Sequence, residues 1–252
     1  MFVDADDTIE TGLATALAFA QNTFVDMLWC QWRKQKDNSE FELVKSDFEY
    51  SKIISGIDFC EHYYDMMVHG APWSYLIKKS YIDSLGIAFV EDRRMEDTDW
   101  VEKHLFYCNS FSCSQSIIYS YFNNEESTMH SFNADKDADA LMYSIRRMQF
   151  ADIVASSAKQ FSNRIYEYAS NQISRIFSFR HLTRYNAKSI YTLFTKSLDP
   201  DTESYLSQHE CFHKWPHFTR LCIKHSLVIC AIISIIHPFA KIARSIYRFL
   251  FI

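Results

Sequence analysis

Glycine and proline are scarce in this chain of 252 residues, which holds only 4 of each. Both numbers lie far below average usage in soluble proteins. A sheet built from many strand–helix units normally needs more glycine in its turns, so we expect long helices to dominate much of the chain. The composition, 48% hydrophobic and 23% charged, is that of a globular protein with one large or two modest domains.

A CxxC pair and a leader segment are also missing. The seven cysteines are scattered, and no basic segment followed by an apolar run opens the chain. We therefore expect reduced, buried cysteines in a cytoplasmic protein. A zinc site is the weaker alternative: His209, Cys211 and His213 are two residues apart, a spacing that does not bring ligands to one helix face.

Acidic residues are absent after Glu210. Residues 1–152 hold 13 Lys and Arg against 26 Asp and Glu, whereas residues 153–252 hold 13 against 5, so the net charge of −5 divides into −13 and +8. An acidic front and a basic tail suggest that the two parts face different partners. We expect no nucleic-acid partner.

No apolar run is long enough to cross a membrane, because Leu227–Ile236 is about half of the length that a span needs. Beyond it, three cations fall on one side of a helical wheel and four bulky apolar residues on the other. This pattern predicts a basic amphipathic helix over residues 226–252 that lies on an anionic membrane surface. A helix packed on the protein with a solvated basic edge is the alternative. The two sets are Lys241, Arg244 and Arg248, and Phe239, Ile242, Ile246 and Phe249.

The order of the remaining patterns predicts a mixed first half and a helical second half. We expect helices over residues 10–21, 58–67 and 96–108, strands over 24–33 and 115–122, a short strand within 85–94 after a helix that ends at Gly86, and a turn over 34–40. From about residue 137 apolar residues recur at three- and four-residue steps to about 197, and Asp199-Pro200-Asp201 marks a break. The recurring residues are Leu141, Ile145, Met148, Ala151, Val154, Ala155, Ala158 and Phe161.

The segment "FVDADDT", residues 2–8, combines an apolar pair with three carboxylates. We expect a buried strand at residues 2–4 whose end carries Asp4, Asp6 and Asp7. Burying unpaired carboxylates costs several kcal/mol, which a divalent cation would offset. Mg²⁺ is typically held by one or two carboxylates together with phosphate oxygens. Two chemistries use such a segment: phosphoryl transfer through an aspartyl nucleophile, and metal-assisted transfer from a nucleotide-sugar.

The first chemistry would make Asp4 a nucleophile. The pattern D-x-D-x-T of Asp4 to Thr8 resembles haloacid-dehalogenase-type, Mg-dependent phosphatases, in which Asp4 would attack and Asp6 would act as acid and base. That family also needs further strand–helix units and a glycine before a second acidic pair. "MEDTDW" has the acids without the glycine, and the chain after residue 137 has no parallel-sheet pattern.

The second chemistry has support from three motifs in order. "FVDADDTIE", "APWSYLIKKSYIDSLGIAFVEDRRMEDTDWVEKHLFYCNSF" and "SIIYSYFNNEESTMHS" together resemble inverting family 2 glycosyltransferases over about residues 1–135. The resemblance implies an α/β fold, a partial GT-A (nucleotide-diphospho-sugar transferase) sheet followed by a helical C-terminal region. It implies transfer of a hexose from a nucleoside-diphosphate sugar to a glycan or lipid-linked acceptor in bacterial surface polysaccharide synthesis, at the cytoplasmic face of the inner membrane.

The same resemblance implies roles for individual residues. Asp4 and Asp6 would bind the donor and a Mg²⁺ or Mn²⁺ ion, which neutralises the departing diphosphate. Asp97, within Glu96-Asp97, would be the catalytic base, and its strength must come from partial desolvation, since a helix N-terminus lowers a carboxyl pKa. Trp73 would stack on a sugar or pack in the core. Ser127 matches a serine of the donor-binding loop.

The chain departs from the family at two places. Phe122 occupies a slot that usually holds a basic residue near the diphosphate. In the family, further strand–helix units precede the Asp-x-Asp segment, so we expect this chain to correspond to the back part of a transferase, impaired in activity or a non-catalytic truncated paralogue. The expected divisions are residues 1–135, the C-terminal part of the catalytic domain, 136–225, a helical extension, and 226–252, the membrane-surface helix.

Overall fold

The structure is a computed structural model that describes the chain except for residues 38–39, 67–70, 92–93, 123–132, 183, 226–228 and 230–252. The chain divides into two compact units. The first unit holds residues 1–130 and 154–162, and the second holds 131–153 and 163–252. The first unit therefore takes in a short segment from the middle of the expected helical extension.

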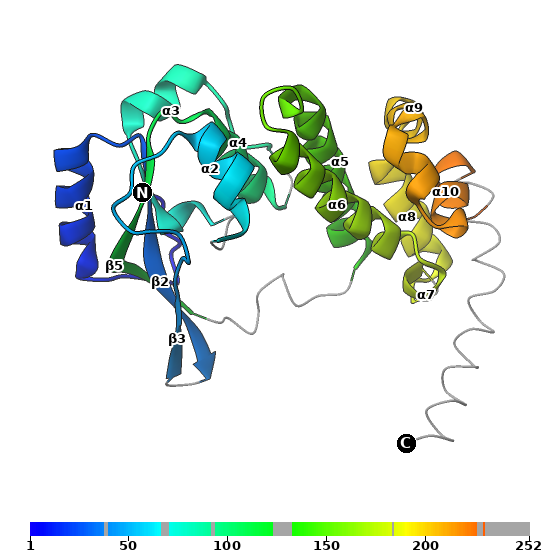
Figure 1. The fold of residues 1–252 in the computed structure, drawn as a ribbon. Coiled ribbons are helices and arrows are strands. Elements are labelled where there is room, and N and C mark those ends of the chain that lie inside the picture. The colour runs from blue at the N-terminus through cyan, green and yellow to red at the C-terminus, as the bar shows by residue number, and fades with distance from the viewer. Residues whose placement is uncertain are drawn as a thin grey trace. The chain divides into compact units, whose positions relative to one another are not determined.

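A mixed sheet forms the centre of the first unit (Figure 1). Its path runs β1-β5-β2-β3, and β4 pairs with β2. The long strands β2 and β5 are parallel, with Met27 opposite Phe111 and Lys34 opposite Tyr121, and the other pairings are antiparallel. The strands are β1 (Thr8–Ile9), β2 (Met27–Asp37), β3 (Glu40–Val44), β4 (Tyr75–Ile77) and β5 (Phe111–Tyr121).

Helices cover the sheet on both sides (Figure 1). They are α1 (Gly12–Thr23), α2 (Gly56–Tyr63), α3 (Lys79–Leu85), α4 (Glu96–Tyr107) and the short 3₁₀ turns η1 (Tyr64–Met66) and η2 (Pro72–Ser74). Two of the rare glycines permit close packing. A Cβ at Gly12 would lie 2.3 Å from the carbonyl oxygen of Ile117 in β5, and one at Gly56 would lie 1.8 Å from that of Leu105 in α4. These glycines let α1 approach β5 and α2 approach α4.

The buried part of the sheet follows directly from the apolar first half of β2. Met27, Leu28, Trp29 and Cys30 have no exposed surface, because the run is covered on both faces. Further along, β2 turns polar where it forms a hairpin with β3. Of the expected turn over residues 34–40, Lys34 to Asp37 in fact belong to β2, so the connection is shorter than predicted.

Most elements expected in the first half are confirmed. The predicted helices correspond to α1, α2 with η1, and α4, the predicted strands correspond to β2 and β5, and Gly86 ends α3 with a φ of 61°. Two predicted strands are wrong. Residues 2–4 form no strand, since Phe2 packs among aromatic rings instead of joining the sheet, and residues 85–91 and 94 form none either.

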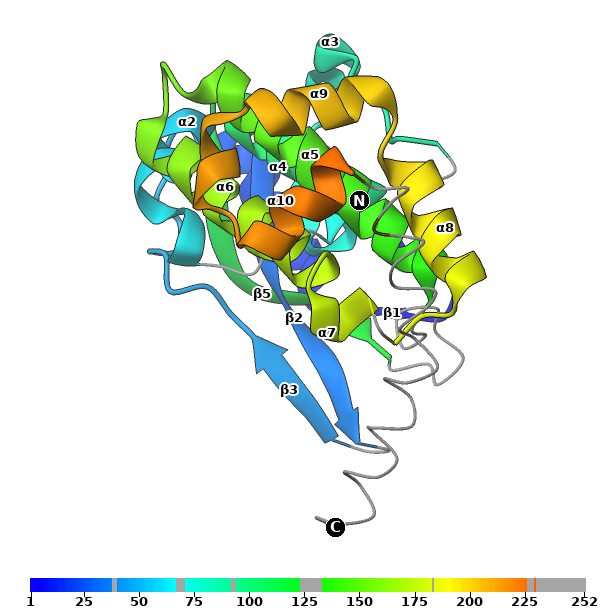
Figure 2. The same ribbon diagram turned by 90° about the vertical axis from the view of Figure 1, so that its right-hand side faces the viewer.

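The second unit is built from helices, as predicted. They are α5 (Ala134–Val154), α6 (Lys159–Ile176), α7 (Phe179–Leu182), α8 (Ala187–Ser197), α9 (Pro200–Gln208), the 3₁₀ helix η4 (Glu210–Lys214) and α10 (His217–Lys224). The break at Asp199-Pro200 is confirmed: Asp199 caps α9 by accepting a hydrogen bond from the Thr202 N–H at 2.7 Å. The helices α9 and α10 lie side by side (Figures 1 and 2).

The predicted apolar stripe is buried except at Ala155, which is exposed. A buried polar cluster joins α5 to the segment around α7. Asp137 of α5 accepts hydrogen bonds from His181 and from Tyr185. Although burial alone would raise the pKa of Asp137, these bonds hold it below its ordinary value. The chain thus consists of an α/β unit with a mixed sheet, followed by a helical region, which confirms the predicted fold class.

Candidate functional site

The acidic segment, residues 4–7, forms a turn that leads into β1. The Asp7 N–H donates to the carbonyl oxygen of Asp4 at 3.3 Å and closes the turn. The end of β5 holds it in place: the Asp4 N–H donates to the Tyr119 hydroxyl at 3.0 Å, and the Phe122 N–H donates to Asp7 Oδ1 at 2.9 Å. The backbone of Asp4 and the carboxylate of Asp7 are therefore held by the end of β5 and by Phe122, which follows it, although no strand precedes the segment.

The charges in this segment are crowded and only partly satisfied. The pKa of Asp4 is raised, first by partial burial of its carboxyl group and then by the neighbouring charges of Asp7 and Asp6. Asp7 Oδ2 is buried and meets no donor in hydrogen-bond geometry within the described chain. A cation or a ligand with donors would relieve both conditions.

Whether a metal fits can be judged from these residues. Among the residues that the structure places, no three His, Cys, Asp or Glu side chains converge on one metal position. Mg²⁺ usually takes one or two carboxylates and completes its shell with water and phosphate oxygens. Asp4 and Asp6, which are both exposed, fit that arrangement. The segment thus suits a cation that arrives with a diphosphate.

Aromatic rings form a wall beside the acidic segment. Trp73 stacks on Tyr119 with ring centres 4.4 Å apart and on Tyr121 at 5.9 Å, and its edge meets Trp32 at 4.7 Å. Only 8% of Trp73 is exposed. Of the two roles that the sequence left open for Trp73, this position favours packing over stacking on a sugar.

Burial and the nearby carboxylates raise the pKa of the tyrosines of this wall. Burial raises the pKa of Tyr121, and the charges of Asp7, Asp6 and Asp4 raise it further. Burial likewise raises the pKa of Tyr119. Both hydroxyls therefore stay protonated beside the acidic segment. The Tyr119 hydroxyl interacts with Asp7, which also raises its pKa, so the Tyr121 hydroxyl is the donor that we consider for a ligand.

Asp97 lies in the first turn of α4. Its Oδ1 accepts hydrogen bonds from the N–H and the hydroxyl of Thr98, at 2.7 and 3.3 Å. The pKa of Asp97 is nevertheless raised, because burial and the neighbouring Glu96 outweigh those bonds. The expectation that desolvation gives this carboxylate its strength as a base agrees with this direction. Just before α4, Met95 adopts a left-handed backbone with φ 63°, which is costly for a residue with a side chain.

An aromatic cluster links the acidic segment to α4. Phe2 contacts Phe89 and Trp100 edge-on, with ring centres 5.5 and 5.3 Å apart, and Phe89 stacks on Trp100 at 4.8 Å. Trp100 lies one helical turn after Asp97. Asp4 lies two residues after Phe2, so this cluster connects the start of the acidic segment to the first turn of α4. The two acidic motifs, 90 residues apart in the sequence, thereby belong to one neighbourhood.

Sequence reasoning missed four residues of this neighbourhood. Asp7 was named with the acidic segment but was given no role of its own, and the hydroxyls of Tyr119 and Tyr121 were not singled out, nor was Arg94. Arg94 is half-buried and has a buried Nη1 atom without a hydrogen-bond partner in the described part of the chain. A cationic group two residues before Glu96 could have been noticed as a phosphate-binding candidate, whereas the tyrosines depend on the register of β5.

Two expectations fall partly or wholly outside the described residues. Ser127 and nearly all of the tail, residues 226–252, lie outside, so their roles stay predictions. The six described cysteines are free and buried. Within the helices that the structure describes, none is both long and apolar enough to cross a membrane. His209, Cys211 and His213 form no metal-binding group.

Comparison with known proteins gave structural matches alone. No protein-family model and no curated protein matches the sequence. The chain resembles S. aureus TarS residues 1–349 in complex with UDP-GlcNAc (15% identity, TM-score 0.49), covering 94% of this chain and 64% of that one. The UDP complex of the same fragment matches with 15% identity and a TM-score of 0.45, covering 94% of this chain and 63% of that one. The structure of S. aureus TarS matches with 13% identity and a TM-score of 0.43, covering 94% of this chain and 38% of that one. The chain thus spans less than two thirds of these structures, and because all TM-scores lie below 0.5 we base no inference on the likeness.

Proposed function

We propose that this chain carries the transfer centre of an inverting, GT-A-type family 2 glycosyltransferase, which moves a hexose from a nucleoside-diphosphate sugar to a glycan or lipid-linked acceptor. The observation that carries the proposal is the joining of two acidic motifs by the Phe2, Phe89 and Trp100 cluster. One motif suits a metal and a diphosphate, and the other holds a carboxylate with a raised pKa. A metal-dependent transfer with a general base needs both.

The acidic segment would hold the donor. Asp4 and Asp6 would bind Mg²⁺ or Mn²⁺, which when bound neutralises charge on the departing nucleoside diphosphate. The buried Nη1 of Arg94 and the protonated hydroxyl of Tyr121 can donate hydrogen bonds to phosphate oxygens. The segment would therefore bind and orient the leaving group, with Ser127 contributing as the resemblance to the family implies.

Asp97 would take the proton of the acceptor hydroxyl. A carboxylate with a raised pKa is a stronger base once it is ionised, and Asp97 owes its raised pKa to burial first and to Glu96 second. The acceptor oxygen would attack the anomeric carbon on the face opposite the leaving diphosphate, so the configuration would invert. Glu96 acts in this proposal by tuning Asp97.

The wider setting is also part of the proposal. The basic second part of the chain and the amphipathic tail suit an anionic membrane surface, where lipid-linked acceptors of bacterial surface polysaccharide synthesis reside. A peripheral position at the cytoplasmic face of the inner membrane would bring the transfer centre close to such acceptors.

The test is release of nucleoside diphosphate from UDP- and GDP-hexoses in the presence of Mn²⁺. We expect Asp97→Asn to lower the rate by about 10²–10⁴-fold, as removal of a general base does, and Asp6→Asn to abolish it. Asp83→Asn, which changes an exposed aspartate paired with Lys79 on α3, is the matched control and should leave the rate unchanged. Because the chain is expected to be impaired, a low wild-type rate is expected, and equal measurable rates for wild type and Asp97→Asn, or for wild type and Asp6→Asn, would contradict the proposal. No release from any donor would favour the non-catalytic truncated paralogue.

The phosphatase alternative is not favoured. It needs Asp4 at the end of a strand in a parallel sheet, and residues 1–7 form no strand. Hydrolysis of p-nitrophenyl phosphate that is lost in Asp4→Asn and unaffected by Asp97→Asn would revive it.

A further inference from the structure

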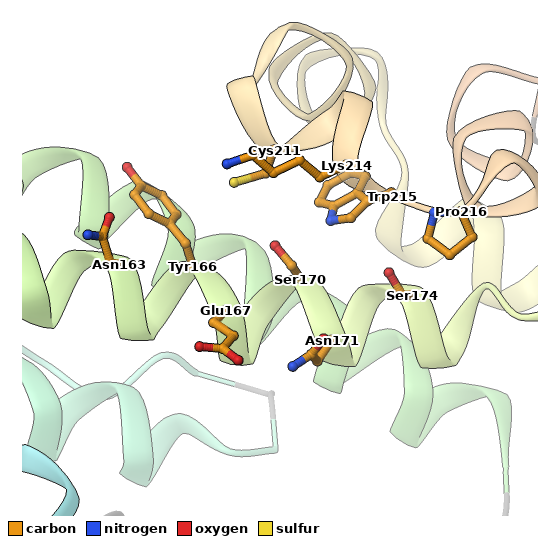
Figure 3. A pocket seen from close by; sticks show the side chains of 10 residues that line it. All are labelled: Asn163, Tyr166, Glu167, Ser170, Asn171, Ser174, Cys211, Lys214, Trp215 and Pro216. Atoms are coloured by element: carbon orange, nitrogen blue, oxygen red, sulfur yellow. The ribbon is translucent and has the colours of Figure 1, made fainter.

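The second unit contains a pocket of about 630 Å³ that the transfer centre does not use (Figure 3). One wall is a stripe along α6, whose members are all polar and recur at the three- and four-residue steps of one helix face. The other wall is the turn from Cys211 to Pro216, formed by η4 and the start of α10. The stripe consists of Asn163, Tyr166, Glu167, Ser170, Asn171 and Ser174.

This polar stripe differs from an ordinary solvated helix face. The opposite side of α6 is fully committed to the core through Ile165, Ala169 and Ile173, of which at most 1% is exposed. A polar helix face normally meets open water. Here Asn163, Glu167 and Asn171 are exposed, but Tyr166, Ser170 and Ser174 are half-buried. Together with Cys211, Lys214, Trp215 and Pro216 the stripe lines an open pocket within the size range of small-molecule sites, about 300–1,000 Å³.

Trp215 gives the pocket an unsatisfied donor. The residue is only 4% exposed, and its indole N–H is buried without a hydrogen-bond partner among the described residues. In Figure 3 the indole nitrogen is on the side that faces α6, above Ser170 and Asn171. Buried donors are almost always paired in folded proteins, so this N–H points to a ligand that carries an acceptor.

The walls are held in place before any ligand binds. Asp152 accepts hydrogen bonds from Tyr166 and from the Tyr205 hydroxyl, the latter at 2.7 Å, and its Oδ1 lies 3.3 Å from His209 Nε2. The Nδ1 atom of His209 in turn accepts from the Cys211 N–H at 3.2 Å. One carboxylate thus fixes the ring of Tyr166 and the first residue of the opposite wall, which lowers the cost of ordering on binding.

The lining selects a chemical class. It offers hydroxyls, carboxamides and an indole N–H beside a lining surface that is more apolar than polar, and its two charged members, Glu167 and Lys214, cancel. A saccharide presents both hydroxyl groups and apolar C–H faces. A phosphate ligand would call for an excess of cations, and an apolar side chain would call for apolar walls. A neutral ligand with many hydroxyl groups matches donors and acceptors of this kind.

We propose that this pocket binds a neutral saccharide. The ligand's hydroxyl oxygens would accept from Trp215 Nε1, and its hydroxyl groups would exchange hydrogen bonds with Ser170, Ser174 and Asn163 of α6. The pocket gives the protein a means of holding a glycan through the second unit. The proposal does not depend on transferase activity, since every residue in it belongs to the helical unit.

Saturation-transfer NMR on the whole chain tests it, with maltotriose, cellotriose and chitotriose as probes. We expect transfer to at least one of them. Ser170→Leu, which fills the pocket, should abolish the transfer, and Trp215→Phe, which removes one hydrogen-bond donor and keeps a packed ring, should weaken affinity about tenfold. Thr195→Leu, the same kind of change at an exposed position of α8, is the matched control and should bind as the wild type does.

Circular dichroism of each variant shows whether it is folded. If Ser170→Leu is not folded, the binding of Trp215→Phe decides the matter. No transfer to any of the three saccharides overturns the proposal. Binding that is equal in the wild type and in folded Ser170→Leu or Trp215→Phe overturns it too. Asp97→Asn should leave saccharide binding unchanged while it lowers the glycosyltransferase rate. Failure of the pocket proposal and failure of the proposed activity are therefore distinguishable.

Discussion

Asp97 shows how the requirements of stability and of chemistry conflict at a single residue. Its pKa is raised in the folded chain, chiefly by burial, so the unfolded chain releases this proton at a lower pH than the folded chain does. The free energy of unfolding therefore falls as pH rises from the ordinary carboxyl value through the raised one. Above the raised pKa the folded protein bears this loss in full.

The first prediction follows from that sign. Asp97→Asn keeps an oxygen that can accept from Thr98 and removes the ionisation, so the variant should be at least as stable as the wild type at pH 7. The advantage should vanish below the ordinary carboxyl pKa, where both residues are neutral. Urea unfolding at several pH values measures it. A variant that is clearly less stable at pH 7 would mean that the charged form of Asp97 stabilises the fold.

A second prediction concerns Glu96. Its charge is one of the causes that raise the pKa of Asp97, so Glu96→Gln should lower that pKa and move the acid limb of the transfer rate to lower pH. The rate on the plateau should change little, because Glu96 does not take the proton in this account. An unmoved acid limb, or a rate as low as that of Asp97→Asn, would contradict the tuning role.

At this scale the sequence predicted the residues whose chemistry is local and missed those that depend on the fold. Asp4, Asp6 and Asp97 could be chosen from short acidic motifs. Tyr119 and Tyr121 could not, because they face the acidic segment only through the position of β5, and the orphaned atoms of Asp7 and Arg94 are consequences of packing. Trp73 was chosen from the sequence as a residue that could stack on a sugar or pack in the core, and the structure covers its ring with Tyr119.

At the scale of elements, the long periodic segments were predicted well and the short ones were not. The helices α1 and α4 and the strands β2 and β5 have many residues whose patterns agree. Residues 2–4 read as a strand because Phe2 and Val3 are apolar, but Phe2 is satisfied by Trp100 and Phe89, and no neighbouring strand pairs with it in the described chain. A short apolar run does not reveal whether a ring cluster or a sheet will bury it.

The third prediction concerns the packing of α2 on α4. Gly56→Ala places a Cβ against the Leu105 carbonyl, so the two helices must separate, and stability should fall by about 1–3 kcal/mol, the usual cost of overpacking. Gly86→Asn is the control: nothing lies within 4 Å of a Cβ there, and asparagine tolerates the left-handed backbone. Equal thermal unfolding midpoints for wild type and Gly56→Ala would show that α2 can move freely.

At the scale of the whole molecule, the chain combines an acidic first part with a basic second part. The fold class could be predicted from the change of pattern near residue 137. The inclusion of residues 154–162 in the first unit could not, because the helical stripe continues without interruption through that segment.

The fourth prediction belongs to this scale and concerns the tail, which lies outside the described residues. Each cation near an anionic leaflet contributes about 1 kcal/mol, so the chain should float with anionic vesicles at low salt and release at high salt. Replacing Lys241, Arg244 and Arg248 together by glutamine should weaken flotation. Retention at high salt, or no effect of the triple change, would contradict a surface-bound helix held by charge.

The central claim is that the acidic segment binds a divalent cation together with a nucleoside diphosphate. Electron paramagnetic resonance of Mn²⁺ measures this, because the signal of the free ion falls as the ion is bound. Since UDP and GDP bind Mn²⁺ themselves, each signal is compared with that of the same mixture without protein. With UDP or GDP present, we expect the wild type, Asp97→Asn and the control Asp83→Asn to bind Mn²⁺ alike, and Asp6→Asn to bind it at least about tenfold more weakly, a loss of about 1.4 kcal/mol. Equal binding by Asp6→Asn and the wild type would contradict the account.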